Sequence, residues 1–287
     1  MSDTPSQKGR VLVIAGSDSG GGAGIQADIK SIMAQGAYAS TAISALTAQN
    51  TLGVQDIMDV PPAFVVSQMT SILTDIGADM MKTGMLATRP VIEAVAEARS
   101  QLAPQLPMII DPVMVATSGD RLLQDEAMGA LKSLLVDRAF LVTPNLPEAS
   151  LLVRRDVDTL DDMKRAADAL MNDGAHAALI KGGHGSARVV SDLLAMQSGM
   201  EVFEHERIDT KNTHGTGCTL ASALAGQLAK AMAAANAGED GLNDKGQPSD
   251  STLRSACETA LDYVHKAITN APNIGSTSSG GNGPLWH

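Results

Sequence analysis

One short segment combines a glycine-rich turn, threonines and a cysteine at the start of a helical pattern. It reads Lys211-Asn-Thr-His-Gly-Thr-Gly-Cys218-Thr219, and the run 220–231 that follows is typical of a helix. A helix start offers unpaired N–H groups and a partial positive charge, so it attracts anions. Gly215 and Gly217 lack a Cβ, which lets the backbone approach an anion closely. The segment therefore predicts a site that stabilises a transferring phosphoryl group.

Cys218 lies in the predicted first turn of that helix. A thiol at a helix N-terminus tends to have a lowered pKa, so Cys218 is a candidate for proton transfer beside the anion. His214 precedes the glycines and is either a base or an ordinary loop residue. The other cysteine, Cys257, lies in an apolar helical pattern, and we interpret it as a core thiol.

A second glycine-rich segment, Gly16-Ser-Asp-Ser-Gly-Gly-Gly-Ala-Gly24, follows an apolar strand pattern. Its glycine spacing resembles a dinucleotide fingerprint. However, no acidic residue closes a second strand about 20 residues later, where such a motif places its ribose partner. A flexible turn before a helix explains the segment equally well. Asp28, one turn into that helix, faces the ligand or satisfies the helix dipole.

Three further motifs carry groups that suit a ligand, and each also has an ordinary structural explanation. Gln49 and its neighbour Asn50 could read the edge of a heterocycle, or simply form a turn. Glu148, in Asn145-Leu-Pro-Glu148, could hold Mg²⁺, although Asn145 and Glu148 also match a common capping pattern. Lys181, in Lys181-Gly-Gly-His184, suits a nucleotide phosphate or an ordinary loop.

The elements that must position these motifs alternate between short apolar runs and helical patterns. The strand-like runs are 11–15, 39–45, 79–82, 108–111, 140–143 and 177–181, and the helical patterns between the first of them are 25–35, 63–76 and 89–102. This alternation indicates βαβ units, an α/β fold and a mainly parallel sheet. Ligands of such sheets gather beyond the carboxyl ends of the strands, where every motif above is expected to lie. The motifs are therefore expected to converge on one cleft.

The last third of the chain has a different pattern. Runs 189–196 and 202–208 predict a hairpin, and a final helix is expected over 252–268. The polar segment 236–251 predicts a mobile surface loop, and residues 1–9 a flexible N-terminus. Since no repeat or linker divides the chain, we expect one domain over residues 1–287.

Composition excludes several classes of protein. The chain has 287 residues and a formal net charge of −11, which argues against binding to nucleic acid or to an anionic membrane surface. Two cysteines do not make a disulfide framework, and no apolar run is long enough to span a bilayer. With no signal-peptide pattern, these features favour a cytoplasmic protein.

Taken in order, the motifs resemble those of the hydroxymethylpyrimidine/phosphomethylpyrimidine kinases of thiamine biosynthesis, over nearly the whole chain. The segments that carry the resemblance are Gly16 to Asp28, Ala45-Leu-Thr-Ala-Gln-Asn50, Lys82-Thr-Gly-Met-Leu86, Asp111-Pro-Val-Met-Val115, Thr143-Pro-Asn-Leu-Pro-Glu-Ala149, Lys181-Gly-Gly-His184, Asn212-Thr-His-Gly-Thr-Gly-Cys-Thr219 and Gly283-Pro-Leu-Trp-His287. Segment 236–251 looks like an insertion.

The resemblance implies a ribokinase-like fold, with helices on both faces of a mainly parallel central sheet, and a homodimer. It implies a kinase that uses ATP and Mg²⁺ to phosphorylate 4-amino-5-hydroxymethyl-2-methylpyrimidine and then its monophosphate. Gln49 and Asp28 would bind the pyrimidine, in a pocket lined by Gly16, Met85 and Val113. The ATP side would consist of Asn145, Glu148 and Lys181, with Glu148 near the metal. The anion hole would be Gly215, Thr216, Gly217 and Cys218, and Cys218 would accept the hydroxymethyl proton in the first step.

Three other functions remain compatible with parts of this pattern. A pyridoxal or pyridoxine kinase of the same superfamily acts on a similar hydroxymethyl heteroaromatic compound, and Gln49 and the second phosphorylation discriminate against it. A noncatalytic sensor of a pyrimidine or nucleotide would consume no ATP. A nicotinamide dehydrogenase is disfavoured by the missing acidic ribose partner.

Overall fold

The structure, a computed structural model, describes most of the chain. The described residues are 8–115, 119–120, 122–124, 126–183, 188–236, 238, 240–277 and 280–287. The predicted flexible N-terminus falls mostly outside this set, as does His184 of the Lys181 motif. The mobility predicted for segment 236–251 stays a prediction.

One nine-stranded sheet runs through the described part of the chain, in the order β3-β2-β1-β4-β5-β6-β7-β8-β9. The run of strands from β2 to β7 is parallel, while β3, β8 and β9 pair antiparallel at the two edges. The strands are β1 (Arg10–Asp18), β2 (Tyr38–Asn50), β3 (Gly53–Asp59), β4 (Met80–Thr83), β5 (Met108–Ile110), β6 (Leu141–Val142), β7 (Ala177–Ile180), β8 (Val189–Met196) and β9 (Gly199–Glu206). The predicted mainly parallel α/β sheet is confirmed.

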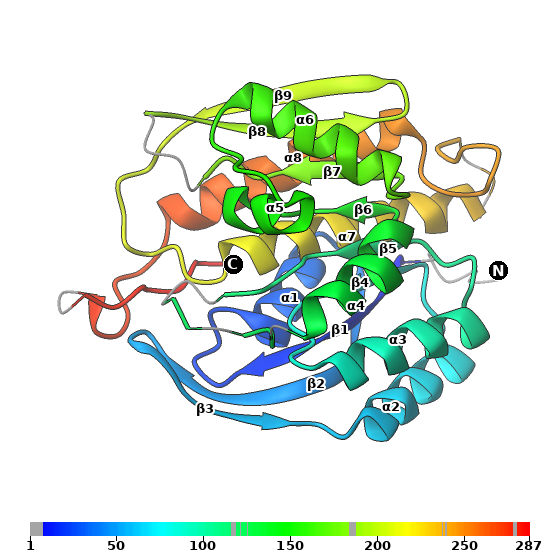
Figure 1. The fold of residues 1–287 in the computed structure, drawn as a ribbon, viewed down its shortest axis with the longest axis horizontal. Helices are drawn as coiled ribbons and strands as arrows, with labels where there is room; N and C mark the ends of the chain where they lie inside the picture. Colours follow the sequence, from blue (N-terminus) through cyan, green and yellow to red (C-terminus); the bar gives the residue numbers. More distant parts are fainter. Residues whose placement is uncertain are drawn as a thin grey trace, which may run out of the picture.

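Helices cover both faces of this sheet (Figure 1). One face packs against α1 (Gly24–Ala34), α7 (Thr216–Asn236) and α8 (Asp250–Thr269). The other packs against α2 (Pro62–Asp75), α3 (Arg89–Leu102), α4 (Ala127–Ala130), α5 (Leu146–Val153) and α6 (Leu160–Asn172). A π-helical turn (Leu131–Leu135) and a 3₁₀ turn (Val136–Arg138) follow α4.

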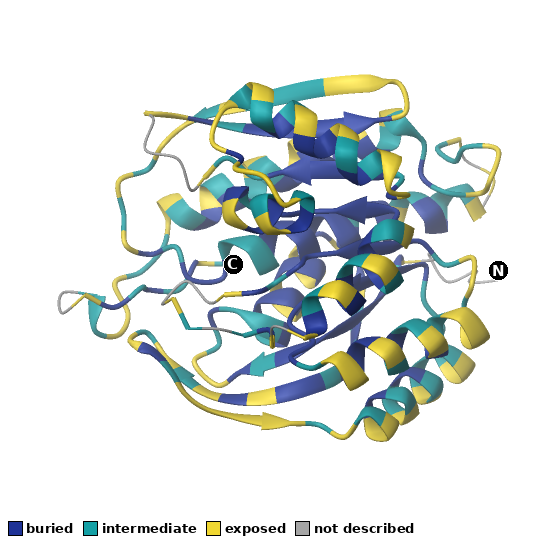
Figure 2. Ribbon diagram, viewed as in Figure 1, coloured by how far each residue is buried: buried dark blue, intermediate teal, exposed yellow. Residues whose placement is uncertain are grey.

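The central strand β1 explains why two separate cores form. Val11 and Val13 point into the core beneath α1, α7 and α8, whereas Leu12 and Ile14 point into the opposite core. All four are fully buried because helices cover both faces of the sheet. A strand in this position therefore has apolar side chains on both of its faces. Figure 2 shows the same pattern, with a buried sheet centre and a largely exposed strand β3 at one edge.

The structure differs from the expected elements in two places near the site. β2 continues to Asn50 rather than ending at residue 45, because the unpredicted strand β3 pairs with its second half. Helix α7 begins at Thr216, so Gly217 and Cys218 belong to the helix itself. The predicted hairpin is confirmed as β8 and β9.

No helix in the described residues is both long enough and apolar enough to cross a membrane.

Candidate active site

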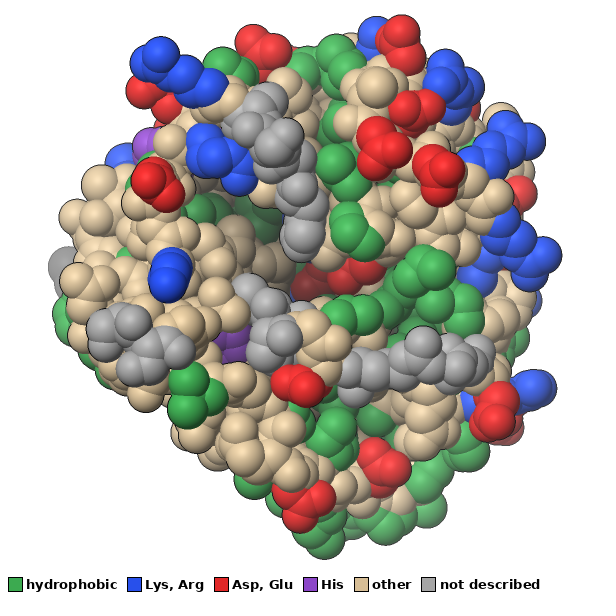
Figure 3. Space-filling model, turned by 60° about the vertical axis from the view of Figure 1, so that its left-hand side comes forward, with side chains coloured by type: hydrophobic (Ala, Val, Ile, Leu, Met, Phe, Trp, Pro, Cys, Tyr) green, Lys and Arg blue, Asp and Glu red, His purple; other side chains and the backbone are tan. Residues whose placement is uncertain are grey.

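The predicted motifs come together at the carboxyl ends of the parallel strands. In Figure 1 these ends point to the side on which the C-terminus lies, and Figure 3 turns this side forward. The surface there is hollowed, with acidic side chains on the floor of the hollow and a histidine near its rim. The motifs therefore share the end of the sheet at which this hollow lies.

The anion-binding turn lies at the N-terminus of α7. Gly215 has a φ of +84°, and a Cβ on it would lie 1.8 Å from the Gly22 carbonyl oxygen, so only glycine fits. The N–H of Thr216 already donates to the Thr213 carbonyl oxygen, at 3.2 Å. In the part of the chain that the structure describes, the N–H groups of Gly215, Gly217 and Cys218 have no such acceptor. Three of the four predicted N–H donors are thus available to an anion.

One side of this turn is formed by Lys181, Asp111 and Glu148. The Lys181 Nζ donates to Asp111 Oδ1 at 2.9 Å, and a Cβ on Gly217 would lie 3.2 Å from the same Nζ. Burial lowers the pKa of Lys181, but Asp111 and Glu148 outweigh this and raise it overall. A permanent cation therefore lies against the anion-binding turn.

Glu148 and Asn145 form the capping box that their spacing suggests. The Asn145 Oδ1 accepts from the Glu148 N–H, and Glu148 Oε2 accepts from the Asn145 N–H, both at 2.9 Å. Burial and the nearby Asp111 raise the pKa of Glu148 to about 7, against the lowering effect of Lys181. The capping function and a ligand-binding function are compatible, since only one carboxylate oxygen is used by the cap.

The same acidic pair suits a divalent cation. Asp111 Oδ2 is buried without a hydrogen-bond partner, and the repulsion between Asp111 and Glu148 is of the kind that a cation relieves. Among the described residues, no group of three or more His, Cys, Asp or Glu side chains is placed to hold a metal alone. Mg²⁺ is commonly held by one or two carboxylates together with water and phosphate oxygens, so the donor set fits.

The other side of the turn is a small apolar cluster separate from the two cores. It contains Met85, with Val113 packed against it. A Cβ on Gly16 would lie 3.1 Å from the Met85 sulfur, so Gly16 allows this side chain to pack against β1. Three predicted lining residues, Gly16, Met85 and Val113, are therefore neighbours.

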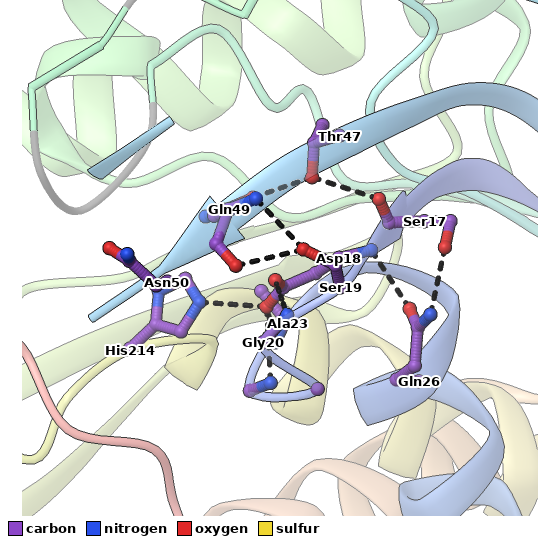
Figure 4. A network of polar contacts seen from close by, with 12 residues as sticks. Ser17, Asp18, Ser19, Gly20, Ala23, Gln26, Thr47, Gln49, Asn50 and His214 are labelled. Atoms are coloured by element: carbon purple, nitrogen blue, oxygen red, sulfur yellow. Dashed lines mark hydrogen bonds and ion pairs between the residues drawn. The ribbon is translucent and has the colours of Figure 1, made fainter. Parts of the chain in front are cut away.

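Gln49 lies at the end of β2, beside the glycine-rich turn (Figure 4). Its Oε1 accepts from the Thr47 hydroxyl at 3.0 Å, and its backbone N–H donates to Ser19 Oγ at 2.8 Å. Within the described residues its side-chain NH₂ has no acceptor. The amide is thus held on one side and can donate to a heterocycle on the other.

Asp28, which the resemblance assigns to the pyrimidine, lies in the interior beside Lys82. It is fully buried, and its Oδ1 accepts from Lys82 Nζ at 2.8 Å and from the Ser222 hydroxyl at 2.6 Å. Burial lowers the pKa of Lys82, but the carboxylates of Asp28 and Asp111 outweigh burial and raise it above its ordinary value. These contacts make Asp28 the counterion of a buried ammonium group.

The lowered pKa expected for Cys218 is wrong for this structure. Burial raises the pKa of the thiol to about 12, and Asp28 and Asp111 add to the increase. Lys82 and the Gly24 N–H act in the opposite direction without reversing it. Cys218 is therefore a neutral thiol at neutral pH in the free protein.

Sequence patterns assigned no role to Lys82 or Asp111, although both lie in motifs at strand ends. Each is buried and charged, and each contacts a predicted site residue. A lysine at the end of an apolar strand is a weak signal, because the same residue in a loop is solvated. The resemblance could have identified both as candidate site residues, because its motifs contain Lys82 and Asp111.

Comparison with known protein families gives one consistent result. The model of a family described as phosphomethylpyrimidine kinase matches residues 18–242. The chain is 40% identical over 279 residues to the hydroxymethylpyrimidine/phosphomethylpyrimidine kinase of Bacillus subtilis, covering 97% of this chain and 94% of that protein. It is 42% identical over 283 residues to the thiamine biosynthesis bifunctional protein ThiED of Geobacter sulfurreducens. That match covers 99% of this chain, which spans about half (53%) of the Geobacter protein.

A solved structure matches the fold at similar coverage. The crystal structure of an ADP complex of Bacillus subtilis pyridoxal kinase superposes with a TM-score of 0.80 and 33% sequence identity, over 97% of both chains. The ribokinase-like fold expected from the motifs is confirmed by this similarity.

Proposed function

The chain belongs to the phosphomethylpyrimidine kinase family, and on that premise we propose that it phosphorylates 4-amino-5-hydroxymethyl-2-methylpyrimidine and then the resulting monophosphate, with ATP as the donor. The observation that carries the proposal is the position of the anion-binding turn. On one side of the turn lie the charged residues Lys181 and Glu148. On the other side lie the apolar Met85 and the side-chain amide of Gln49.

The transfer needs positioning and charge stabilisation more than covalent chemistry. The N–H groups of Gly215, Gly217 and Cys218 stabilise the equatorial oxygens of the phosphoryl group in transit, and Lys181 adds a positive charge beside them. Asn145 and Glu148 belong to the ATP side of the site. Asp111 and Glu148 would hold Mg²⁺, which when bound offsets the charge of the phosphate oxygens.

On the acceptor side, the Gln49 amide reads the edge of the pyrimidine, and Gly16, Met85 and Val113 pack against its ring. Asp28 acts through Lys82, since its Oδ1 accepts from Lys82 and Ser222 in the interior, while its Oδ2 is buried without a hydrogen-bond partner. Cys218 contributes its N–H group in both steps. To accept the hydroxymethyl proton in the first step, Cys218 must be a thiolate, so bound substrate would have to lower its pKa from about 12.

The remaining expectations belong to the same proposal. Residues 1–287 act as one kinase domain, the protein is cytoplasmic and forms a homodimer, and its ligands are small molecules rather than nucleic acid or membrane.

A pyridoxal kinase activity is the second candidate, because the similarity to the pyridoxal kinase structure spans both chains almost completely. The deciding experiment is an ADP-release assay with hydroxymethylpyrimidine, its monophosphate and pyridoxal in parallel. We expect turnover of the first two compounds. Activity on pyridoxal alone would refute the proposal. If none of the three compounds stimulates ADP release, a different acceptor is favoured.

A further inference from the structure

A single carboxylate shapes the glycine-rich turn between β1 and α1. Asp18 Oδ1 accepts from the Gly20 N–H at 2.7 Å, and Oδ2 accepts from the N–H groups of Gly22 at 3.1 Å and Ala23 at 2.8 Å (Figure 4). Asp18 is only 2% exposed. Burial raises its pKa, but the hydrogen bonds from His214 and from these backbone groups outweigh burial and lower it. The turn therefore folds around an ionised side chain.

The same carboxylate reaches the anion-binding turn. His214 Nε2 lies 2.9 Å from Asp18 Oδ2, and both side chains are almost fully buried. The imidazole ring also packs against the glycine-rich turn, because a Cβ on Gly22 would lie 2.5 Å from His214 Cδ2. Figure 4 shows His214 approaching Asp18 from the side opposite to Gln26. His214 is thus a specific contact rather than a free loop residue.

Backbone contacts connect the glycine-rich turn, which Asp18 holds in place, to the anion-binding turn at Gly215 to Cys218. The carbonyl oxygen of Gly22 lies so close to Gly215 that no side chain fits there, and the backbone N–H of Gly24 lies near enough to Cys218 to act against the increase in the pKa of its thiol. The two turns therefore touch at Gly215 and approach each other again near Cys218. A shift of the glycine-rich turn must move Gly215 or Cys218 as well.

The glycine-rich turn also contacts the acceptor pocket. Ser19 Oγ donates to the Gln49 carbonyl oxygen and accepts from the Gln49 N–H, both at 2.8 Å. Gln26 fixes the preceding residues, since it accepts from the Asp18 N–H at 2.9 Å and donates to Ser17 Oγ at 2.8 Å. One short segment, residues 17–24, is therefore tied to Gln49 on one side and to the anion hole on the other.

We propose that Asp18 and His214 are positioning residues, whose hydrogen bond fixes the separation between the Gln49 end of the acceptor pocket and the anion hole at Gly215 to Cys218. This inference rests on the proposed kinase reaction. In-line transfer requires the acceptor oxygen and the phosphoryl group to be aligned, and a misplacement of about 1 Å can reduce the rate about 100-fold. In this proposal both side chains act through the backbone of the two turns.

The proposal predicts a kinetic pattern that a proton-transfer residue does not give. Because the pair sets geometry for both acceptors, its loss lowers kcat for both phosphorylations. The Lys181 and Glu148 side makes no hydrogen bond or ion pair with Asp18 or His214 among the described residues, so the KM for ATP stays within about twofold.

The test compares His214→Gln with His214→Leu, and adds Asp18→Asn. Glutamine can place an amide N–H near the position of His214 Nε2, whereas leucine cannot donate. We expect kcat for both steps to fall about 10- to 100-fold in His214→Leu and Asp18→Asn, and to recover at least severalfold in His214→Gln. The matched control is His205→Gln, since His205 lies 3.8 Å from Asp192 and packs edge-on against the His265 ring, both away from these two turns.

Two measurements separate positioning from loss of fold. Urea unfolding establishes which variants are folded under assay conditions, and calorimetry with AMP-PCP reports the nucleotide side without turnover. Equal kcat values in His214→Gln and His214→Leu, or a kcat within threefold of the wild type in His214→Leu, would overturn the proposal.

If the wild-type protein phosphorylates neither pyrimidine, the proposed function fails, and deuterium exchange then tests the pair directly. The amides of Gly20, Gly22 and Ala23 are bonded to Asp18, so exchange over residues 17–24 should accelerate at least tenfold in His214→Leu and not in His205→Gln. Unchanged exchange in His214→Leu would refute the positioning role whatever the substrate.

Discussion

The buried pair of Asp28 and Lys82 gives the sharpest test, because two interpretations of Asp28 predict opposite results. Neither side chain is exposed, and their charged atoms lie 2.8 Å apart. If Asp28 binds the pyrimidine directly, as the resemblance implies, Asp28→Asn raises the KM for the pyrimidine and leaves stability nearly unchanged. If Asp28 is the counterion of Lys82, the same substitution leaves a buried ammonium group without its partner, and stability falls first.

The size of the loss follows from this burial. Removing one partner of a buried ion pair typically costs about 3–5 kcal/mol, a large part of a total stability of about 5–15 kcal/mol. With an m-value of about 3 kcal/mol per M of urea, the unfolding midpoint of Asp28→Asn should fall by roughly 1 to 1.7 M. In the double variant Asp28→Asn/Lys82→Met both charges are removed, and at least half of the lost stability should return.

The assay is urea unfolding monitored by circular dichroism. The kinetics of each phosphorylation are measured on the same preparations of protein. The control is Glu93→Gln, which breaks the exposed pair with Arg89 and should leave the midpoint unchanged. A midpoint for Asp28→Asn within about 0.2 M of the wild type, together with a raised KM for the pyrimidine, would show that the counterion reasoning is wrong.

Three other predictions concern the anion hole and the acidic side. Because the pKa of its thiol is raised to about 12, Cys218 should react slowly with iodoacetamide at pH 8 and faster as pH rises. If bound substrate lowers this pKa so that the thiolate acts as a base, Cys218→Ala should lower kcat for the first phosphorylation at least tenfold more than for the second. Equal losses in both steps would leave Cys218 a positional role only. Glu148 has a pKa of about 7, so its proton competes with Mg²⁺ and activity at fixed free Mg²⁺ should rise with pH through about 7. The raised pKa also means that the free protein loses stability as pH rises from 4.5 through about 7, and Glu148→Gln should remove both dependences. Gly215→Ala forces a Cβ towards the Gly22 carbonyl oxygen and should lower kcat at least 100-fold, whereas Gly129→Ala, with open space around its Cβ, should have the activity of the wild type. Retained activity in Gly215→Ala would contradict the close approach of the two turns.

Local patterns predicted the parallel part of the fold because several of its strands are short apolar runs. β1 and β7 are buried on both faces, and their sequences show this without any knowledge of the neighbours. Strand β3 has the opposite property. It lies at an edge with mostly exposed residues, so its existence depends on pairing with β2 and leaves little trace in its own sequence.

The site was predictable as a set of strand ends and not as a set of contacts. The position of Lys181 beside the anion hole follows from the carboxyl-end rule, since β7 ends where the cleft must lie. The pairing of Asp18 with His214 does not, because 196 positions separate the two residues and neither motif shows which partner the other will meet. The prediction of a lowered pKa for Cys218 was wrong for a related reason. A helix N-terminus lowers the pKa of a solvated thiol, but burial and the carboxylates of Asp28 and Asp111 decide the outcome here.

The wide sequence separation across the site has a consequence for the order of folding. Strands β1 and β2 with helix α1 form a local βαβ unit that can assemble early, whereas Asp18 meets His214 only after the chain up to α7 has been placed. Early in refolding, the glycine-rich turn therefore lacks the histidine that completes its hydrogen bonds. Phosphate binding and catalysis should return in the slowest phase, after most of the helical signal has recovered, so the activity of a refolding sample measures the final docking step rather than the collapse of the sheet.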